Sequence, residues 1–341
     1  MKNLKNNFKH LQQLALGGLL FITLLSSCSK SSNDEKPATP VPGSVKDIYI
    51  CGWRYASTGK KQGTYWKNGV AFSVTDGTYD AELVDIEVIG NDVYTCGFEN
   101  NGTLNVSKLW KNNIGSVLSF LPNNKVFGLA SINNDIYVAG IKTNNEYGYW
   151  KNDTNNFTLI PNSNFAEPVG ITTSGTDIYT FVYSNVGVNC YKNNSFIRKL
   201  GNSQFKPSSI KVDGTNLYVA GDYNGKATYF KNATEVQVSS QASKIFDIDV
   251  INDDVYICGS ETVTAKYWKN VTPISPNTTG IYESYLKGIK VVGNDVYVCG
   301  DAYNYGVSFT TSRFWKNQTR TELTEPINGT SRATSIFITY N

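Results

Sequence analysis

The 341-residue chain contains a single histidine, His10, and it lies in an N-terminal leader. From residue 28 onward the chain has no histidine at all. This absence excludes Ser-His-Asp and Cys-His catalysis in the exported part of the protein. It also excludes every metal site that depends on a histidine ligand. We therefore expect no cofactor and no resident metal ion.

Excess charge of one sign is also missing. Three of the 31 Lys and Arg residues, Lys2, Lys5 and Lys9, belong to the leader, so the rest of the chain has 28 basic residues against 28 acidic ones. Nucleic-acid binding needs clustered Lys and Arg, because the phosphates must be neutralised. A sparsely charged chain of zero net charge therefore indicates that nucleic acid is not a partner.

The leader has the pattern of a secretory signal. Its basic start is followed by a twelve-residue apolar run, Leu14 to Leu25, which is too short to span a bilayer as a helix. The next residues, Leu25-Ser26-Ser27-Cys28, resemble the lipobox of bacterial lipoproteins, in which the cysteine is acylated and becomes the N-terminus. We predict a lipoprotein signal peptide over residues 1–27, lipidation at Cys28 and attachment to the membrane through that lipid. An ordinary signal peptide is the alternative.

Residues 28–43 are mostly Ser, Asn, Asp, Glu, Lys and Pro without an apolar pattern, which predicts a flexible tether. The resemblance to Gram-negative lipoproteins, together with Ser29 in place of Asp, implies the outer membrane. The expected location is the cell envelope, on either the periplasmic side or the cell surface.

Residues 44–341 form one domain built from a unit that recurs seven times. Its first marker is Asp-(Val/Ile)-Tyr-x-(Cys/Ala)-Gly, with variations, and its tyrosines are 45, 43, 42, 39, 38 and 41 residues apart. These tyrosines are Tyr49, Tyr94, Tyr137, Tyr179, Tyr218, Tyr256 and Tyr297. The second marker is an aromatic residue followed by Lys-Asn, and its aromatic residues are Trp66, Trp110, Trp150, Tyr191, Phe230, Trp268 and Trp315. Repeats of about 40 residues with strand patterns are typical of propellers.

Each unit is expected to contain four antiparallel strands, A to D in chain order, with turns rich in Asn, Asp and Gly. The first unit begins at strand B. The last is followed by residues 333–340, which align with strand A of the other units. The C-terminal strand should therefore complete the first unit and close the ring. This pattern resembles the seven-bladed β-propeller superfamily, and the Tyr-Trp-Lys-Asn unit looks like repeats in uncharacterised bacterial lipoproteins. The sialidase Asp-box, the WD-repeat signature and the paired glycine of kelch repeats are absent, so the resemblance implies a fold and no activity.

The repeated aromatic residues and cysteines are expected to be structural. The Trp and Tyr of strand C recur at one position, which predicts packing between blades. Cys51, Cys96, Cys258 and Cys299 also share one position, where Ala139 and Ala220 stand in other units. Interchange with alanine predicts free interior thiols; disulfides are the alternative.

The B–C and D–A loops of a propeller open on one face, where sites usually lie. A first candidate set follows the strand-B glycine and comprises Trp53, Arg54, Tyr55, Phe98, Glu99, Lys142, Tyr183, Asp222, Tyr223, Glu261, Asp301, Tyr303 and Tyr305. Such aromatic, acidic and basic residues suit a sugar or peptide ligand. The alternative is ordinary variation of solvated loops.

A second candidate set occupies one register of the innermost strand A, four residues before its central Ile or Leu. It comprises Arg332, Glu82, Lys125, Glu167, Lys206, Lys244 and Tyr285. These charges are expected to compensate one another around the channel mouth, leaving Lys244 as a local positive pocket for a carboxylate or phosphate. Asp85 and Asp247 are expected to line the channel below. Water or a calcium ion is a further candidate there, but hard-cation sites usually need more oxygen ligands than these two residues supply.

The sequence favours a non-catalytic binding or scaffold module, monomeric and lipid-anchored, whose ligand is a glycan, a peptide or an envelope protein. The alternative is a glycosidase or lyase that uses two carboxylates. Its candidate residues are Glu82, Glu167, Glu99, Asp222 and Asp301.

Overall fold

The structure is a computed structural model that describes residues 44–119, 125–142, 146–152, 156–161, 167–304, 306, 309–323 and 329–341. These residues belong to one compact unit, Pro40–Asn341. The side chains of Ser119, Glu167 and Pro168 are not described. The predicted signal peptide, Cys28 and the tether lie outside the described residues, as does Tyr305.

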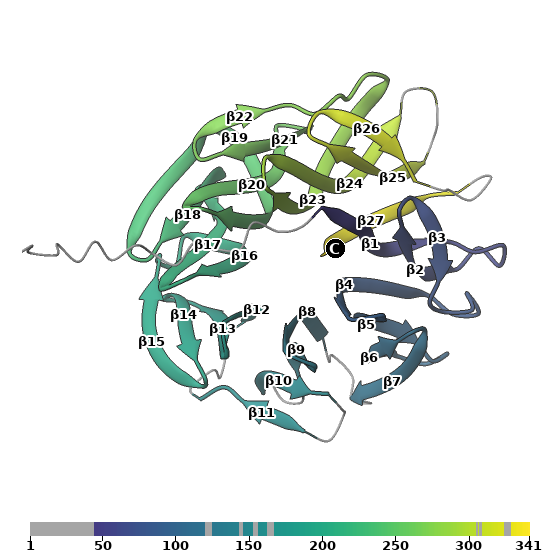
Figure 1. Ribbon diagram of the computed structural model, residues 1–341, viewed down its shortest axis with the longest axis horizontal. Helices are drawn as coiled ribbons and strands as arrows, with labels where there is room; N and C mark the ends of the chain where they lie inside the picture. Colours follow the sequence, from purple (N-terminus) through teal and green to yellow (C-terminus); the bar gives the residue numbers. More distant parts are fainter. Residues whose placement is uncertain are drawn as a thin grey trace, which may run out of the picture. The chain divides into compact units, whose positions relative to one another are not determined.

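The described residues form an all-β, propeller-like fold of antiparallel strands, and they contain no helix. Within this part of the chain, nothing helical is present that could cross a membrane. Six sheets are formed, each with consecutive hairpins except at the chain ends (Figure 1).

The strands are ordered within their sheets as follows. The first sheet is β27 (Ser331–Tyr340), β1 (Val45–Tyr55), β2 (Lys61–Lys67) and β3 (Val70–Ser73). The second is β4 (Ala81–Ile89), β5 (Asp92–Asn100), β6 (Asn105–Lys111) and β7 (Ile114–Ser119). The third is β8 (Lys125–Ile132), β9 (Asp135–Ile141), β10 (Tyr147–Lys151) and β11 (Phe157–Leu159). The fourth is β12 (Glu167–Ser174), β13 (Asp177–Ser184), β14 (Gly187–Lys192) and β15 (Ser195–Leu200).

The fifth sheet has seven strands: β16 (Phe205–Asp213), β17 (Asn216–Tyr223), β18 (Lys226–Lys231), β19 (Thr234–Ile251), β20 (Asp254–Glu261), β21 (Thr264–Lys269) and β22 (Thr272–Ile274). The sixth is β23 (Ile281–Val292), β24 (Asp295–Asn304), β25 (Thr310–Lys316) and β26 (Thr319–Glu322). The 18-residue β19 joins two repeats, since its first part pairs with β18 and its second part pairs with β20.

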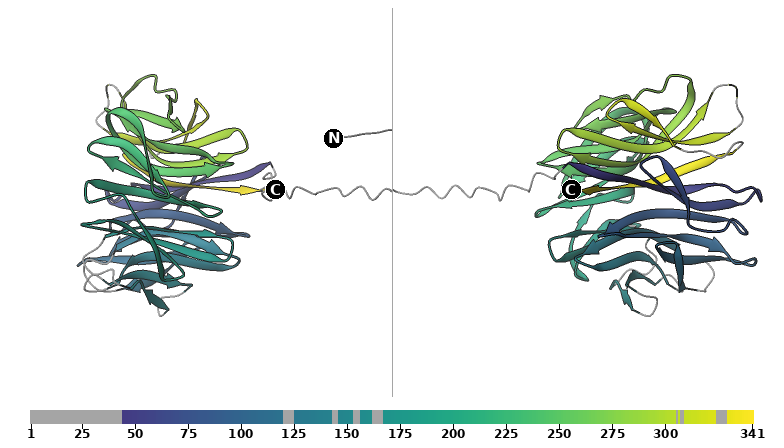
Figure 2. Two further views of the ribbon diagram at one scale, coloured as in Figure 1. Left: turned by 90° about the vertical axis from the view of Figure 1, so that its left-hand side faces the viewer. Right: turned by 45° about the vertical axis from the view of Figure 1, so that its right-hand side comes forward.

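The two ends of the described chain lie in one sheet. β27 pairs antiparallel with β1, with Ile338 opposite Ile48. The backbone N–H of Asn341 donates to the carbonyl of Ser44 at 3.0 Å, and its side-chain amide donates to the Ser44 hydroxyl at 2.8 Å. Figure 2 shows β1 and β27 side by side. The C-terminal strand thus occupies the strand-A position of the first repeat.

The two sequence markers meet in a local structure, here called the clasp, made by the first residue of strand B and the Lys-Asn at the end of strand C. In the second repeat, the Asn112 side-chain oxygen accepts from the Val93 N–H at 2.9 Å, and its amide donates to Asp92 at 2.7 Å. Lys111 pairs with the other oxygen of Asp92 at 2.7 Å and lies 5.4 Å from the ring centre of Tyr94. One asparagine and one lysine therefore join strands B and C at that end.

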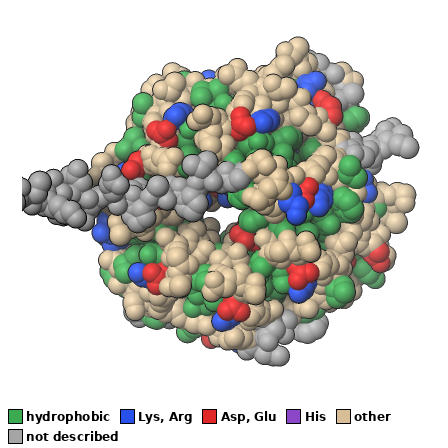
Figure 3. Space-filling model, viewed as in Figure 1, with side chains coloured by type: hydrophobic (Ala, Val, Ile, Leu, Met, Phe, Trp, Pro, Cys, Tyr) green, Lys and Arg blue, Asp and Glu red, His purple; other side chains and the backbone are tan. Residues whose placement is uncertain are grey.

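The clasp recurs around the fold. Its asparagines all have positive φ, which asparagine tolerates better than most residues; they are Asn68, Asn112, Asn152, Asn193, Asn232, Asn270 and Asn317. Hydrogen bonds from lysine hold the pKa of each clasp aspartate below its ordinary value; these are Asp47, Asp92, Asp135, Asp177, Asp254 and Asp295. Figure 3 shows such pairs of basic and acidic side chains at intervals around one face, which we call the clasp face. The B–C and D–A loops lie at the opposite ends of the strands, and we call that side the mouth face.

The fifth repeat lacks the clasp aspartate, and this difference shows which contacts of the clasp are constant. Asn216 replaces the aspartate and still accepts a hydrogen bond from the Asn232 amide, at 2.9 Å. Lys231, left without its carboxylate partner on strand B, approaches Asp253 of the next A–B turn at 3.5 Å. The asparagine bonds are therefore the constant part of the clasp, and the ion pair is the variable part.

The strand-C aromatic residues pack against the preceding repeat, as predicted. Trp268, for example, lies in one cluster with Tyr218 and Tyr229, and Trp66 lies in one cluster with Tyr297 and Phe314 of the last repeat. The side chains of Trp66, Trp150, Trp268 and Trp315 are fully buried. This packing explains why an aromatic residue recurs there.

The prediction of free interior thiols is confirmed for Cys51, Cys96, Cys258 and Cys299, and Cys190 is a further buried free cysteine. Burial raises the pKa of each thiol. The thiols are therefore small apolar core groups and poor nucleophiles.

Every strand A contains a β-bulge at the same place. In β4, for example, Leu83 lies opposite Gly97 and Asp85 lies opposite Cys96, so Val84 is the extra residue. Just before the bulge, the strand-A carbonyl turns toward strand B. If the strand-B glycine had a Cβ atom, this atom would lie only 1.9 Å from the strand-A carbonyl oxygen. The distance holds for Gly52, Gly259 and Gly300. The close approach of this carbonyl explains the glycine in six of the repeats, whereas the fourth repeat has the bulge with Val182 at this place.

We expect Asn270→Ala to lower the free energy of unfolding by about 2 kcal/mol, because it removes two side-chain hydrogen bonds and leaves a Cβ at positive φ. Asn270→Gly also removes the bonds but relieves the backbone, so its cost should be about 1 kcal/mol. Urea unfolding of both variants checks this. Equal stability of wild type and Asn270→Ala would contradict the role of the clasp.

Gly259→Ala should lower the free energy of unfolding by more than about 3 kcal/mol, since its methyl group would overlap the Lys244 carbonyl. The matched control is Gly170→Ala, whose methyl group would meet only the Ile210 side chain at 3.5 Å. We expect the control to cost less than about 1 kcal/mol. Thermal unfolding of the two variants should therefore differ clearly, and similar losses would refute the bulge as the cause.

Candidate functional site

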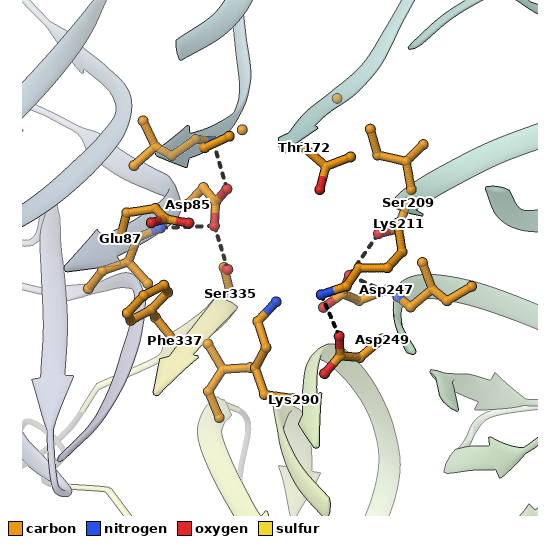
Figure 4. Close-up of a pocket in the computed structure, with 18 of the residues that line it drawn as sticks. Asp85, Glu87, Thr172, Ser209, Lys211, Asp247, Asp249, Lys290, Ser335 and Phe337 are labelled. Atoms are coloured by element: carbon orange, nitrogen blue, oxygen red, sulfur yellow. Dashed lines mark hydrogen bonds and ion pairs between the residues drawn. The ribbon is translucent and has the colours of Figure 1, made fainter. Parts of the chain in front are cut away.

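A cavity of about 480 Å³ runs between the innermost strands and is lined by residues from all seven A strands. These strands are β4, β8, β12, β16, the second part of β19, β23 and β27. Figure 4 shows polar side chains from opposite strands pointing into this space. We call it the channel. It gathers into one place residues that are up to about 250 positions apart in the sequence.

The bulges decide which side chains enter the channel nearest the mouth face. The extra residues of the seven bulges all line the cavity. In the order of the repeats they are Thr334, Val84, Phe127, Val169, Ser208, Phe246 and Lys287. Six of these residues are uncharged. Lys287 is the exception.

Two aspartates follow bulges and tie neighbouring A strands together. Asp85 accepts hydrogen bonds from the Leu129 N–H of β8 at 2.8 Å and from the Ser335 hydroxyl of β27 at 2.6 Å. Asp247 accepts likewise from the Ile289 N–H of β23 at 3.0 Å and the Ser209 hydroxyl of β16 at 2.7 Å. Both therefore line the channel, as predicted.

A second layer of charged residues lies further along the channel, two residues beyond the positions of Asp85 and Asp247 on the A strands. Lys211 pairs with Asp249 at 2.7 Å, and Asp249 also accepts from the Val291 N–H at 2.9 Å. Glu87 accepts from the Ser131 hydroxyl at 2.8 Å. The Lys290 ammonium group points into the space between the Asp85–Glu87 side and the Lys211–Asp249 side (Figure 4).

The electrostatics of this layer follow from burial and mutual charge. Burial works to lower the pKa of Lys290, but the carboxylates of Asp249, Asp247, Asp85 and Glu87 raise it above its ordinary value. Burial raises the pKa of Glu87 to about 7, against the hydrogen bond from Ser131. Near neutral pH, the channel therefore holds a carboxyl group that exchanges its proton and a lysine that stays charged.

No group of three or more His, Cys, Asp or Glu side chains in the described part of the chain could hold a metal ion. The carboxylate oxygens of Asp85 and Asp247 are directed to backbone N–H groups and serine hydroxyls. The arrangement thus gives no support to the calcium site considered for these two residues.

The first candidate set is not presented as a continuous aromatic surface. Trp53 is only 5% exposed, and its ring lies 4.6 Å from the Lys61 ammonium and 6.0 Å from the Arg332 guanidinium. Tyr183 donates to the Ser203 carbonyl, and the Tyr223 hydroxyl accepts from the Asn202 amide. Tyr55 and Tyr303 are 38% and 37% exposed. Trp53 therefore offers no free face to a ligand, and local hydrogen bonds hold the hydroxyls of Tyr183 and Tyr223.

The other members of this set make local contacts. Arg54 donates to the Ser73 hydroxyl, and Lys142 lies 5.2 Å from the centre of the Phe157 ring. Phe98 is half-buried on β5 beside Glu99. Glu261 pairs with Lys266 at 2.6 Å.

The second candidate set does share one register. Each member lies opposite the strand-B residue that directly follows the glycine position of the first marker, for instance Arg332 opposite Trp53 and Lys244 opposite Ser260. The expected chain of compensating charges is not formed among the described members. Glu82 pairs with Lys61 instead of with a ring neighbour, and Lys125 and Lys206 are exposed. Glu167 has no described side chain.

Each described candidate for carboxylate catalysis already has a partner. Glu82 pairs with Lys61, and Glu99 pairs with Lys108 at 2.5 Å. Asp222 accepts from the Gly225 N–H at 2.7 Å, and the buried Asp301 accepts from the Ala333 N–H at 3.1 Å. These contacts give each group a structural role.

Sequence reasoning missed Glu87, Lys211, Asp249, Lys287 and Lys290, which are the charged groups inside the channel besides Asp85 and Asp247. A signal was available. Four of them stand two residues beyond the post-bulge position of strand A, at a register where other repeats have Phe337, Ala130 or Thr172. Charged residues on an innermost strand point into a solvated channel or form a buried network.

We expect Glu87→Gln to change how stability depends on pH. The Glu87 pKa is higher in the folded protein, about 7, than its ordinary value of 4.5. Glu87 therefore makes the protein less stable as the pH rises from about 4.5 to 7. Asp301, whose pKa burial raises to about 6, acts in the same direction.

Urea unfolding at several pH values should show a smaller fall in stability over this interval for Glu87→Gln than for wild type. At pH 8 the variant should be the more stable protein. An unchanged pH profile would refute the burial of Glu87 as the cause.

Comparison with known proteins shows the fold alone. No family model matches the chain, and no curated protein matches it. A puromycin-hydrolyzing peptidase from Mycobacterium tuberculosis is similar over 83% of this chain, with a TM-score of 0.55 and 9% identity. A puromycin hydrolase and a prolyl endopeptidase are similar over 84% and 87%, with TM-scores of 0.54 and 0.51 and identities of 9% and 10%. The matched regions cover 53%, 54% and 50% of those chains, so this chain spans about half their length.

Proposed function

We propose that this protein is a lipid-anchored, non-catalytic binding protein of the cell envelope, built as a closed seven-bladed propeller that takes its ligand at the mouth face of the channel. Three observations support seven blades. The markers occur seven times, seven A strands line one channel, and the seven-stranded sheet divides into two blades at β19. The pairing of β27 with β1 supports closure.

The proposed anchor suits the position of the chain ends. Cys28 would carry the lipid, and residues 28–43 would connect it to Ser44. Ser44 and Asn341 lie at the clasp face, because Val45 pairs with Tyr340 at the end of the sheet that carries the clasps. A tether that leaves from the clasp face would direct the mouth face away from the membrane. In a Gram-negative cell, that orientation would leave the mouth free to meet ligands in the periplasm or outside the cell.

The channel is the single observation that carries the binding function. Its volume of about 480 Å³ is within the range of small-ligand pockets. The lining combines apolar groups such as Phe127 and Phe246 with hydroxyl, carboxylate and ammonium groups that converge from several strands. Such a mixture suits a glycan or a short peptide segment, since apolar surface supplies affinity and a few polar groups supply orientation.

The acidic groups of the channel already accept hydrogen bonds from the protein, and this favours binding over catalysis. The carboxylates of Asp85, Asp247 and Asp249 each accept at least one backbone N–H, and these bonds hold the A strands together. A general acid or base must be free to meet a substrate proton. Glu87, the carboxyl with the raised pKa, is bonded to a hydroxyl group.

The test is an array of glycans and peptides probed with the full protein in detergent, followed by measurement of affinity for the hits. Ser208→Trp should lower that affinity by at least about tenfold, since a large ring would then fill the mouth end of the channel. The fold should tolerate it, because Phe127 and Phe246 occupy the same bulge position in other repeats.

Thr319→Trp, on the exposed outer strand β26, is the matched control and should leave the affinity unchanged. Turnover of a hit, or equal affinity of wild type and Ser208→Trp, would contradict the proposal.

A further inference from the structure

Three cations gather on one side of the mouth, and we call them the mouth cation cluster: Lys244 on β19, Lys287 on β23 and Arg332 on β27. Lys244 and Lys287 lie 5.9 Å and 5.5 Å from the centre of the same ring, that of Tyr285. Burial lowers the pKa of Lys287, and the charges of Arg332 and Lys244 lower it further, against Asp301. The three groups are thus close enough to repel one another.

Lys287 is the unusual member. It is the extra residue of the β23 bulge, the position where the six other A strands carry uncharged side chains. Its ammonium group lies 3.4 Å from the centre of the Phe246 ring, and the residue is half-buried. Among the described residues, no carboxylate forms an ion pair with Lys287, Lys244 or Arg332. A half-buried ammonium group without such a partner is costly unless another anion compensates it.

The acidic groups nearby are already engaged. Asp301 is buried and accepts from the Ala333 N–H at 3.1 Å, and burial raises its pKa to about 6 despite Lys287 and Arg332. Glu283 accepts a hydrogen bond from the Tyr285 hydroxyl. Even with both Asp301 and Glu283 ionised, two negative charges face three positive ones. The cluster therefore has a net positive charge.

Two open aromatic rings, Tyr282 and Tyr303, are carried by the strands that hold Lys287 and Asp301. Tyr303 is two residues beyond Asp301 on β24, so both side chains project from the same face of the strand. The Tyr303 ring is 37% exposed and meets the 58% exposed Tyr282 ring edge to face, with centroids 6.4 Å apart. Exposed rings of this kind can stack on the apolar face of a sugar.

We propose that the mouth cation cluster binds the carboxylate of an acidic sugar, with Lys287 as the central ligand-binding residue and Tyr303 and Tyr282 supporting the sugar ring. The inference rests on the proposed binding function and specifies its ligand class. Two ammonium groups and a guanidinium group suit a carboxylate, since charge-assisted hydrogen bonds are the strong ones. A sugar is favoured over a peptide by the neighbouring exposed rings and by a channel of about 480 Å³.

The experiment measures binding of glucuronate and of short uronate oligosaccharides to the full protein in detergent, by calorimetry at low salt. Glucose and the matching neutral oligosaccharides serve as uncharged counterparts. We expect the acidic ligands to bind at least about tenfold more tightly than the neutral ones, and the difference to shrink at high salt.

Lys287→Met should reduce the affinity for the acidic ligands by at least about tenfold, while Lys287→Arg should retain it. Lys125→Met is the matched control, because Lys125 is an exposed lysine of the Lys244 register on a different strand. Its affinity should stay within about twofold of wild type. Thermal unfolding of each variant shows that the fold is intact.

The outcomes separate this inference from the proposed function. Suppose that neutral glycans or peptides bind, and that their affinity falls in Ser208→Trp but not in Lys287→Met. The binding function then stands, and the acidic-sugar site is refuted. Preference for acidic peptides over uronates would likewise overturn the choice of a sugar. If acetate binds as tightly as glucuronate, the cluster recognises an anion alone and the sugar assignment fails. Absence of binding by every ligand would refute both.

Discussion

The β-bulge, one extra residue in each innermost strand, determines how closely strands A and B approach and which side chains enter the channel near its mouth. The bulge turns a strand-A carbonyl toward strand B, where a side chain as small as a methyl group would overlap it, and six of the seven repeats have a glycine at that place. The same bulge turns one side chain into the channel. A single backbone irregularity therefore explains a sequence signature, the approach of two strands and the composition of the channel mouth.

The channel interior is held by charge as much as by apolar packing. Asp85, Asp247 and Asp249 accept hydrogen bonds from backbone N–H groups of the next A strand along the chain, with which their own A strand forms no ladder. Lys211 and Lys290 offset the resulting negative charge. These groups therefore join neighbouring A strands, and their polar atoms already have partners within the protein. The cations at the mouth differ from them, since they have no such role in holding strands together.

The sequence predicted the repeat, the strand pattern, the buried aromatic residues and the free thiols, because each of these follows from one local unit repeated in order. It also placed Lys244 and Arg332 in one register of strand A. It did not predict that Glu82 would pair with Lys61, since that contact joins β4 to β2 across two repeats. Nor did it predict that Trp53 would be covered by Lys61 and Arg332.

The chain by itself thus determined what is periodic: strands of alternating polarity, turns with Asn at positive φ, and a small residue wherever the backbone approaches closely. Local sterics and hydrophobic alternation are properties of neighbouring residues, so they can be seen in the order of residues. Only the tertiary structure decided which residues from different repeats come into contact. The channel brings together several positions from each repeat, and the charge balance there depends on all of these residues jointly. A lysine such as Lys287 gains its significance only from its neighbours in space, Lys244, Arg332 and the Phe246 ring, which come from other A strands.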